Sequence, residues 1–292
     1  MKHIGKFKVF TITFLIFAIA FSYNNNAYAD IGPKDKLTVH VVNPPDELYY
    51  LDLLAQDTNT YNNFYNEGER EAFNQNMVKL LYSYENEGWR PALVEGTGGP
   101  MWGDLVGKYS GNDMIHTFEY VGVPDKYRII IVTESGKVSV TDAYTRKSLQ
   151  SSITYDYSNG RVTVPPVLLS YILQFLTTCI PTLIIEGIIL VLFGFKIKEN
   201  WKVFLIVNLV TQIGLTLTLG ASLIHNGPVT VYFMQFPAEI GIIIIETFLY
   251  GKLLKGKSVR QRHIYGITAN LLSWAVGFFL LSYQYQLLNL LS

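Results

Sequence analysis

The amino-acid sequence predicts a membrane protein with a signal peptide, a small extracytoplasmic α+β domain and an all-α bundle of four transmembrane helices. Three observations lead to this fold class. Residues 1–29 have the order of a secretory signal, residues 30–165 have the mixed composition of a folded domain, and residues 166–292 contain long apolar runs. The mean hydropathy of the chain is positive and only 16% of its residues are charged, a balance that is unusual for a wholly soluble protein.

The N-terminal segment, residues 1–29, is expected to be a cleaved signal peptide. Its lysines precede an apolar run at residues 9–21, and the sequence Ala-Tyr-Ala comes directly before Asp30. This order of positive, apolar and small residues is typical of secretory signals. An uncleaved anchor helix is the alternative, and both interpretations place residue 30 outside the cytoplasm.

Four apolar runs in residues 166–292 are each long enough to cross a membrane as a helix. Because an α-helix rises about 1.5 Å per residue, roughly 20 residues cross the ~30 Å hydrocarbon layer. The first run is longer than this, so it must tilt, kink at Pro181 or protrude. The expected spans are residues 167–195, 203–224, 229–250 and 264–288.

The positions of Lys and Arg predict the orientation of these spans. Lysines follow the first span, a cluster of Lys and Arg follows the third, and the loop at residues 225–227 has neither. Loops rich in Lys and Arg remain in the cytoplasm. We therefore expect a multi-pass protein of the cell membrane whose N-terminal domain and C-terminus are extracytoplasmic.

Residues 30–165 are expected to form the α+β domain. The only cysteine, Cys179, lies in an apolar run, so this domain has no internal disulfide and folds on its core alone. Alternating and helical apolar patterns predict its elements. We expect strands at residues 37–42 and 49–54, a helix at 69–84, hairpins that turn at 134–136 and 158–160, and an irregular Gly-rich loop at 96–107.

The charge is divided unevenly along the chain. Residues 30–165 carry 12 Lys or Arg against 19 Asp or Glu, and the remaining residues carry 11 against 4. An acidic domain does not offer the basic surface that nucleic acids need. We therefore expect no nucleic-acid partner. The expected partner is the lipid bilayer, and another membrane protein is a further candidate.

Polar side chains within the apolar runs are the candidate site. Counting back from the cytoplasmic charges places groups from all four spans in one layer, and within a helix they share a face. Carboxyl groups in hydrocarbon are costly, so they need partners, water or a function. Interhelical hydrogen bonding that only holds the bundle together is the alternative. The members of this polar cluster are Glu186, Asn208, Thr211, Gln212, Glu239, Glu246, Asn270 and Ser273.

Several catalytic and metal-binding patterns are missing from the sequence. The spans have no histidine, no His-Glu-x-x-His and no nucleophile elbow, so an intramembrane protease is not indicated. Residues 57–68 alternate oxygen ligands at first, but the sixth position is Asn62 and the twelfth is Gly68, where a calcium loop needs Gly and Glu. We expect no catalytic residue, no metal site and no cofactor.

The polar positions also carry a resemblance to a known family. The resemblance lies in the segment around Glu186 and Gly194, in the other polar positions of the spans, and in the strand-like segments at 49–54 and 127–132. The chain resembles a family of uncharacterised membrane proteins from Gram-positive, Firmicute-type bacteria. The resemblance implies an exported domain, four spans and a cytoplasmic-membrane location. It implies no particular activity.

Three classes of function are compatible with these observations. The first is an envelope-facing sensor or interaction protein that works through the exported domain. The second is a small ion-coupled carrier, or a carrier subunit, that uses the intramembrane glutamates. The third is an intramembrane enzyme. We rank them in this order because the exported domain forms almost half of the expected mature chain and four spans are few for an autonomous carrier.

Overall fold

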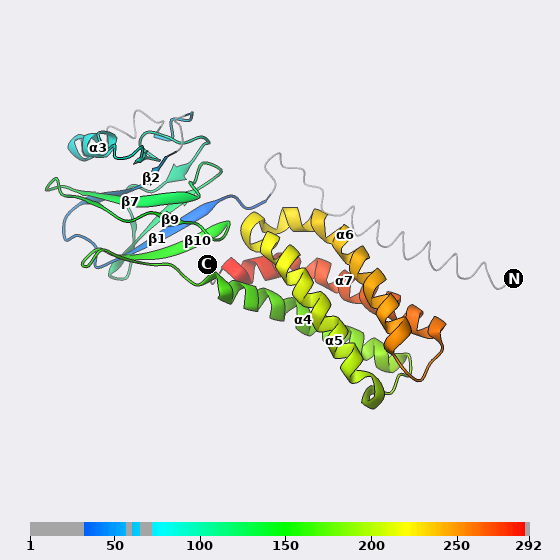
Figure 1. Ribbon diagram of the computed structural model, residues 1–292. Coiled ribbons are helices and arrows are strands. Elements are labelled where there is room, and N and C mark those ends of the chain that lie inside the picture. Colours follow the sequence, from blue (N-terminus) through cyan, green and yellow to red (C-terminus); the bar gives the residue numbers. More distant parts are fainter. Residues whose placement is uncertain (1–31, 57–59, 65–71, 290–292) are drawn as a thin grey trace. The chain divides into compact units, whose positions relative to one another are not determined.

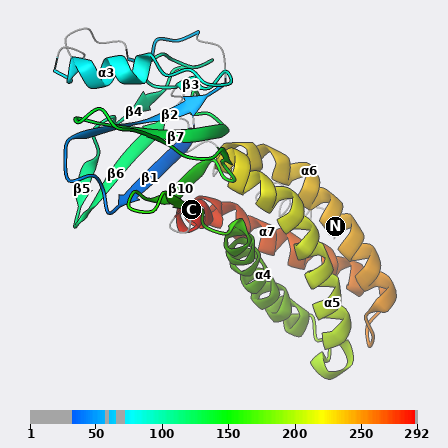
Figure 2. The ribbon, with the colours of Figure 1, turned by 60° about the vertical axis from the view of Figure 1, so that its left-hand side comes forward.

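The structure is a computed structural model that describes residues 32–56, 60–64 and 72–289 (Figures 1 and 2). The predicted signal peptide at residues 1–29 lies outside the described residues, and so do residues 57–59 and the first part of the predicted helix at 69–84. Within the described residues, a β-rich domain comes first and long apolar helices follow.

The β-rich domain consists of two sheets. The first contains β1 (Lys36–Val42), β4 (Trp102–Gly103), β5 (Lys108–Ser110), β6 (Asp113–Glu119), β10 (Gln150–Asp156) and β11 (Arg161–Thr163). The second contains β2 (Tyr49–Ala55), β3 (Arg90–Pro91), β7 (Lys126–Thr133), β8 (Val138–Val140) and β9 (Tyr144–Thr145). β1 is central in the first sheet, parallel to β10 and antiparallel to β6, and β2 pairs with β7 in the second.

The burial pattern of the strands explains how these sheets pack. Every second residue of β1 and β6 is buried, so one face of the first sheet meets the core. All seven residues of β2 are buried, which is the pattern of a strand covered on both faces. One face of the second sheet meets the first sheet, where Tyr49 contacts His116. The helix α3 (Gln75–Tyr82) packs on β2, β3 and β7, and Figure 2 shows it beside that sheet.

The domain follows part of the sequence expectation and departs from it elsewhere. The two predicted hairpins are present, with Gly136 and Gly160 at positive φ in their turns, a conformation that glycine adopts without strain. The predicted Gly-rich loop at 96–107 contains the short strand β4. The domain is therefore richer in strands than the α+β expectation, because short pairings such as that of β4 depend on a neighbouring strand and not on a local pattern.

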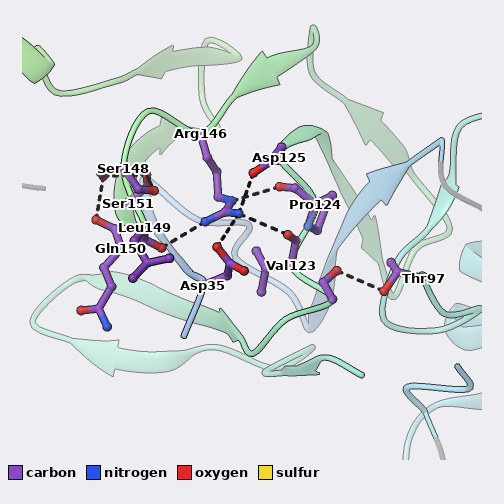
Figure 3. A network of polar contacts seen from close by, with 11 residues as sticks. Asp35, Thr97, Val123, Pro124, Asp125, Arg146, Ser148, Leu149, Gln150 and Ser151 are labelled. Carbon is purple, nitrogen blue, oxygen red and sulfur yellow. Dashed lines mark hydrogen bonds and ion pairs between the residues drawn. The ribbon is translucent and has the colours of Figure 1, made fainter. Parts of the chain in front are cut away.

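Arg146 joins separate loops of this domain (Figure 3). Its guanidinium group is almost fully buried and pairs with Asp35 at 2.8 Å and Asp125 at 2.7 Å. The same group donates hydrogen bonds to the backbone carbonyls of Val123, Pro124 and Leu149. All of its nitrogens are thereby engaged, and the start of β1 is tied to the loops that precede β7 and follow β9.

The apolar part has three long helical segments and not the four separate helices predicted from the sequence. They are α4 (Val167–Leu192), the continuous run Ile197–Leu253, and α7 (Val259–Asn289). Each is long and apolar enough to cross a membrane. The 57-residue run contains α5 (Ile197–Leu215), a π-helical turn (Thr216–Gly220) and α6 (Ala221–Leu253). The predicted loop at 225–227 is reduced to a break in backbone conformation at Gly227, with φ 76° and ψ −179°.

The chain reverses direction at this break. Asn208 contacts Tyr250, Thr211 contacts Glu246 and Ser222 contacts Met234. The two members of each pair lie about equally far before and after residue 228, as they must in an antiparallel hairpin. Figures 1 and 2 show α5 and α6 side by side. The continuous run Ile197–Leu253 therefore consists of two helical rods that pack against each other.

The connections between the helices are shorter than expected. Lys198 and Lys202 lie inside α5 and not in the loop after the first span, and Arg260 and Arg262 lie inside α7. Pro181 lies inside α4. The outward faces of the helices are apolar and exposed, as lipid contact requires. Examples are Leu168, Ile184, Leu192, Val210, Leu217, Phe233 and Phe279.

Candidate functional site

Two carboxyl groups are buried in the interior of the helical part. Glu186 on α4 and Glu246 on α6 each have 1% of their surface exposed. Neither has a Lys or Arg partner among the ion pairs of the described residues. A buried carboxyl without a cation is stabilised by hydrogen bonds, by a bound proton or by both.

Glu246 accepts hydrogen bonds from two neighbouring helices. Thr211 Oγ1 on α5 lies 2.5 Å from Glu246 Oε1, and Asn270 Nδ2 on α7 lies 3.0 Å from Glu246 Oε2. Asn270 also donates to the carbonyl of Gly266. The Glu246 carboxyl therefore connects α5, α6 and α7 at one level of the bundle.

Glu186 is less completely satisfied. Ser273 Oγ on α7 lies 3.0 Å from Glu186 Oε1, whereas the second oxygen, Oε2, is buried and has no hydrogen-bond partner in the described protein. Asn208 lies next to this carboxyl, and its own Oδ1 is also buried without a partner. Buried acceptor oxygens therefore outnumber the donors around Glu186.

Two tyrosines complete the cluster and connect its two carboxyls. Asn208 Nδ2 donates to the Tyr250 hydroxyl at 2.8 Å, and Tyr250 lies next to Glu246. The Tyr265 hydroxyl donates to the backbone carbonyl of Glu186 at 3.4 Å, and the two tyrosine rings are 5.2 Å apart. Both tyrosines have no exposed surface. Asn208 and Tyr250 therefore lie between the two carboxyls and are hydrogen-bonded to each other.

The hydroxyl partners of the carboxyls can serve either protonation state. A hydroxyl has one proton to donate and can also accept. Thr211 Oγ1 lies within 3.0 Å of the carbonyl oxygens of Val207 and Asn208 as well as near Glu246. When Glu246 is ionised, Thr211 donates to it; when Glu246 is protonated, it donates to Thr211 and the threonine proton turns to a backbone carbonyl. Neither state leaves an unpaired hydroxyl.

A cavity of about 70 Å³ adjoins this cluster. Gln212 and Glu239 belong to its lining, as do Glu186, Asn270 and Ser273. Gln212 is buried and its Oε1 has no hydrogen-bond partner in the described protein, while Glu239 is partly exposed. The three glutamates lie close enough to interact electrostatically.

The structure divides the eight residues that the sequence singled out into two groups. Direct hydrogen bonds join Glu186 to Ser273 and Glu246 to Thr211 and Asn270, and Asn208 is hydrogen-bonded to the Tyr250 hydroxyl beside them. Gln212 and Glu239 are not hydrogen-bonded to these six in the described protein and face the cavity instead. No finding assigns a function to these eight residues, so the site remains a prediction.

Sequence reasoning missed several members of the site. Tyr250 and Tyr265 were not singled out, although the spacing of Tyr250 four residues after Glu246 places both on one helix face. Gln174, Gln235 and Gln284 were also passed over, and all three are buried and line the cavity. The signal that could have identified them is a glutamine in an otherwise apolar helix. Burying a glutamine side chain in hydrocarbon costs free energy unless the side chain faces the interior of the bundle.

The carboxyl, amide and hydroxyl groups of the cluster offer oxygen atoms as ligands. Oxygen ligands suit protons or a hard cation better than a soft metal. Within residues 32–56, 60–64 and 72–289, no group of three or more His, Cys, Asp or Glu side chains could hold a metal ion. The chain matches no protein-family model, and neither the curated proteins nor the solved structures contain a match.

Proposed function

We propose that the helical part of this membrane protein takes up and releases protons at Glu186 and Glu246, and that the protein is a small ion-coupled carrier or a subunit of one. The observation that carries the proposal is the hydrogen-bonded cluster that contains both carboxyls. Each carboxyl contacts a hydroxyl that has a second acceptor within reach. In such a site no hydroxyl is left without an acceptor when the proton arrives or leaves.

The proton step balances within the cluster. When Glu186 is protonated, its O–H donates to Ser273 Oγ and the serine proton points to the Asn270 carbonyl. When the proton leaves to water, the carboxylate remains, and the serine proton turns to Glu186 Oε1. No covalent bond other than the O–H bond of Glu186 is broken, and the Asn270 carbonyl keeps its place while the serine proton changes acceptor.

Proton flux in proteoliposomes tests this function. Purified protein is reconstituted with a pH-sensitive dye inside the vesicles, and a potassium diffusion potential is imposed to drive proton entry. We expect Glu186→Gln and Glu246→Gln to abolish the flux, because Gln keeps the shape and most hydrogen bonding but cannot ionise. Glu199→Gln is the matched control, since Glu199 lies outside the cluster and pairs with Lys196.

Two results would count against the proposal. One is unchanged flux in both Gln variants when Leu variants fail only through loss of folded protein, which would make the glutamates structural hydrogen-bonding groups. The other is an equal loss of flux in Glu199→Gln, because the effect would then not be specific to the buried pair.

A specific observation on the β-rich domain favours a second function, recognition of an envelope partner. Trp102 is 58% exposed and its ring centre lies 4.4 Å from that of Tyr120. Tyr120 has φ 89°, a strained conformation for a bulky residue that is often found at functional sites. Cross-linking of the native complex followed by mass spectrometry tests this role. A partner that is lost in Trp102→Ala and retained in Tyr82→Ala would support it, because Tyr82 is similarly exposed at 46%.

The location and topology of the chain belong to the same proposal. We propose a cell-membrane protein whose β-rich domain, Gly227 turn and C-terminus are extracytoplasmic, with residues 1–29 as its signal peptide. The excess of Lys and Arg at residues 196–202 and 252–262 supports this orientation. The resemblance to Firmicute-type membrane proteins is compatible with it, and membership of that family is part of the proposal.

A further inference from the structure

The cavity occupies only one half of the helical bundle. On α4 its lining residues lie at 174–186, on α5 and the π-helical turn at 212–219, on α6 at 223–242 and on α7 at 270–284. In every helix these residues lie on the same side of the carboxyl pair, toward the end where α4 begins and the chain reverses at Gly227. We call this the Gly227 end, and we call the opposite end, with Lys196 and Lys255, the lysine end.

The lining of the cavity offers hydrogen-bonding groups that the protein does not satisfy. Gln174, Gln212 and Gln235 are each at least nine-tenths buried and line the cavity. Gln174 Oε1, Gln212 Oε1 and Gln235 Nε2 have no hydrogen-bond partner in the described protein. Buried polar atoms of this kind are normally paired with protein or water. A volume of about 70 Å³ is several times the ~10–15 Å³ that one water requires.

The backbone of the Gly227 half is also adapted to this lining. Gly220, in the π-helical turn, faces the Gln174 amide, and a Cβ at this position would collide with it. The absence of a side chain leaves room for the glutamine beside the helix. π-Helical turns inside longer helices occur frequently at functional sites.

The other half of the bundle is filled. Between the carboxyl pair and the lysine end, Leu190, Phe195, Val207, Leu254 and Ala269 are buried and pack with the two tyrosines of the cluster. The Tyr250 and Tyr265 hydroxyls both contact the cluster itself. This packing leaves no lining residue of the cavity beyond Glu186 on α4 or before Asn270 on α7.

We propose that, in the conformation of this structure, the cavity is a water-filled half-channel through which the Glu186 carboxyl exchanges protons with the side of the membrane at the Gly227 end only. Passage of a proton to the other side requires the packed lysine half to rearrange. The proposal rests on the proton-binding function and adds a direction to it. Leu223, Val231 and Leu281 line the cavity toward the Gly227 end, together with Gln174 and Gln284, and also belong to an apolar cluster there. Water reaches the glutamines of the lining past these apolar side chains, as it passes hydrophobic constrictions in channels.

Silver ions test the half-channel, because Ag⁺ is small, moves through water and binds thiols. Cys179 is the only cysteine, so Cys179→Ala provides a background without thiols. Gln212→Cys is compared with Val207→Cys in that background. Both positions lie on α5 and are equally buried, with 6% and 5% exposed, and only Gln212 lines the cavity.

Full-length protein is embedded in vesicles of both orientations and exposed briefly to Ag⁺. After denaturation, an alkylating reagent and mass spectrometry count the remaining thiols. We expect Gln212→Cys to react from one side at least about tenfold faster than Val207→Cys, a barrier difference of about 1.4 kcal/mol or more. Thr178→Cys, a substitution of nearly equal size in the same lining, should react from the same side.

Other outcomes overturn the half-channel. These are equal rates for Gln212→Cys and Val207→Cys, equal rates from both sides of the membrane, or no reaction at Gln212 and Thr178 in folded protein. The labelling does not depend on proton transport. One-sided labelling combined with normal flux in Glu186→Gln would keep the half-channel and refute the carboxyl function. Labelling that is equal at Gln212→Cys and Val207→Cys, combined with loss of flux in Glu186→Gln, would refute the half-channel alone.

Discussion

Ser273 on α7 contacts Glu186 on α4 through a hydroxyl that has two acceptors. Ser273 Oγ lies 3.0 Å from Glu186 Oε1 and 3.1 Å from the Asn270 carbonyl oxygen. The single hydroxyl proton can point to only one of them, so its direction depends on whether Glu186 carries a proton. This contact makes the serine hydroxyl a reporter of the state of the carboxyl.

Replacement of this serine should change the carboxyl without unfolding the protein. We expect Ser273→Ala to shift the infrared carbonyl stretch of the protonated Glu186 side chain and to cost about 0.6–2 kcal/mol of stability, the usual range for a polar contact between membrane helices. Ser273→Thr keeps the hydroxyl and should restore the band. A pH-difference infrared spectrum measures it, and a band that is identical in wild type and Ser273→Ala would contradict the contact.

Gly266 should be essential for the packing of α6 on α7. A Cβ at Gly266 would lie 2.9 Å from the Cα of Thr247, and backbone atoms cannot move aside as a flexible side chain can. We expect Gly266→Val to cost about 1–3 kcal/mol through overpacking and to lower the thermal midpoint in detergent. Gly277→Val on the same helix is the control, because a Cβ at Gly277 meets no atom within 4 Å. Equal midpoints for the two variants would refute this packing.

Arg146 should stabilise the β-rich domain through its paired guanidinium group. Its side chain is 5% exposed, whereas that of Asp125 is 86% exposed. We therefore expect Arg146→Met to cost about 2–3 kcal/mol, less than the ~3–5 kcal/mol of a fully buried broken pair. Urea unfolding of the domain measures the loss. Arg161→Met, at an exposed position of β11, should change stability by no more than about 0.5 kcal/mol.

His116 should make the stability of the β-rich domain depend on pH. Burial lowers the pKa of His116 from 6.5 to about 4, and its ring contacts the Tyr49 hydroxyl and the Asp104 carbonyl. As the pH falls below 6.5, the unfolded chain binds a proton before the folded chain does. Stability is therefore present above pH 6.5 and is lost toward pH 4, by at most about 3 kcal/mol.

Residues 30–165 are the part to use for this measurement, because their apolar core is formed by residues within that range. Burial raises the pKa of Asp52 to about 7, although three backbone N–H donors favour its ionised form and lower that pKa. Asp52 therefore acts in the opposite direction to His116, because its contribution to stability is lost as the pH rises toward 7. The difference in unfolding free energy between wild type and His116→Gln isolates the histidine. If this difference stays constant between pH 6.5 and pH 4, the assignment to His116 is wrong. A disordered domain would mean that it needs the helices to fold.

Thiol labelling on intact cells should establish the orientation of the helices. In the Cys179→Ala background, we expect Asn226→Cys, an exposed residue beside the Gly227 turn, to react with an impermeant reagent without permeabilisation. Lys255→Cys, exposed at the lysine end, should react only after permeabilisation, because positive loops stay in the cytoplasm. The opposite pattern would reverse the proposed topology.

Periodicity and composition were sufficient for the features that depend on near neighbours in the chain. Alternating apolar residues predicted β1 and the hairpin of β7 and β8, because strand periodicity and turn residues are local properties. The run lengths predicted apolar helices that could cross a membrane. Counting residues along the helices also predicted that carboxyls and amides from different segments lie at similar depths.

Tertiary structure decided which of these groups meet. Depth and helix face could not distinguish Glu246, which is hydrogen-bonded to Thr211 and Asn270, from Glu239, which faces the cavity. The turn at Gly227 joined two predicted helices into one run because a single residue reverses the chain there. Hydrophobic periodicity gives the depth and the face of each side chain, whereas the rotation of each helix about its axis is set by packing against its neighbours. The carboxyl cluster, its tyrosines and the one-sided cavity exist only through that packing.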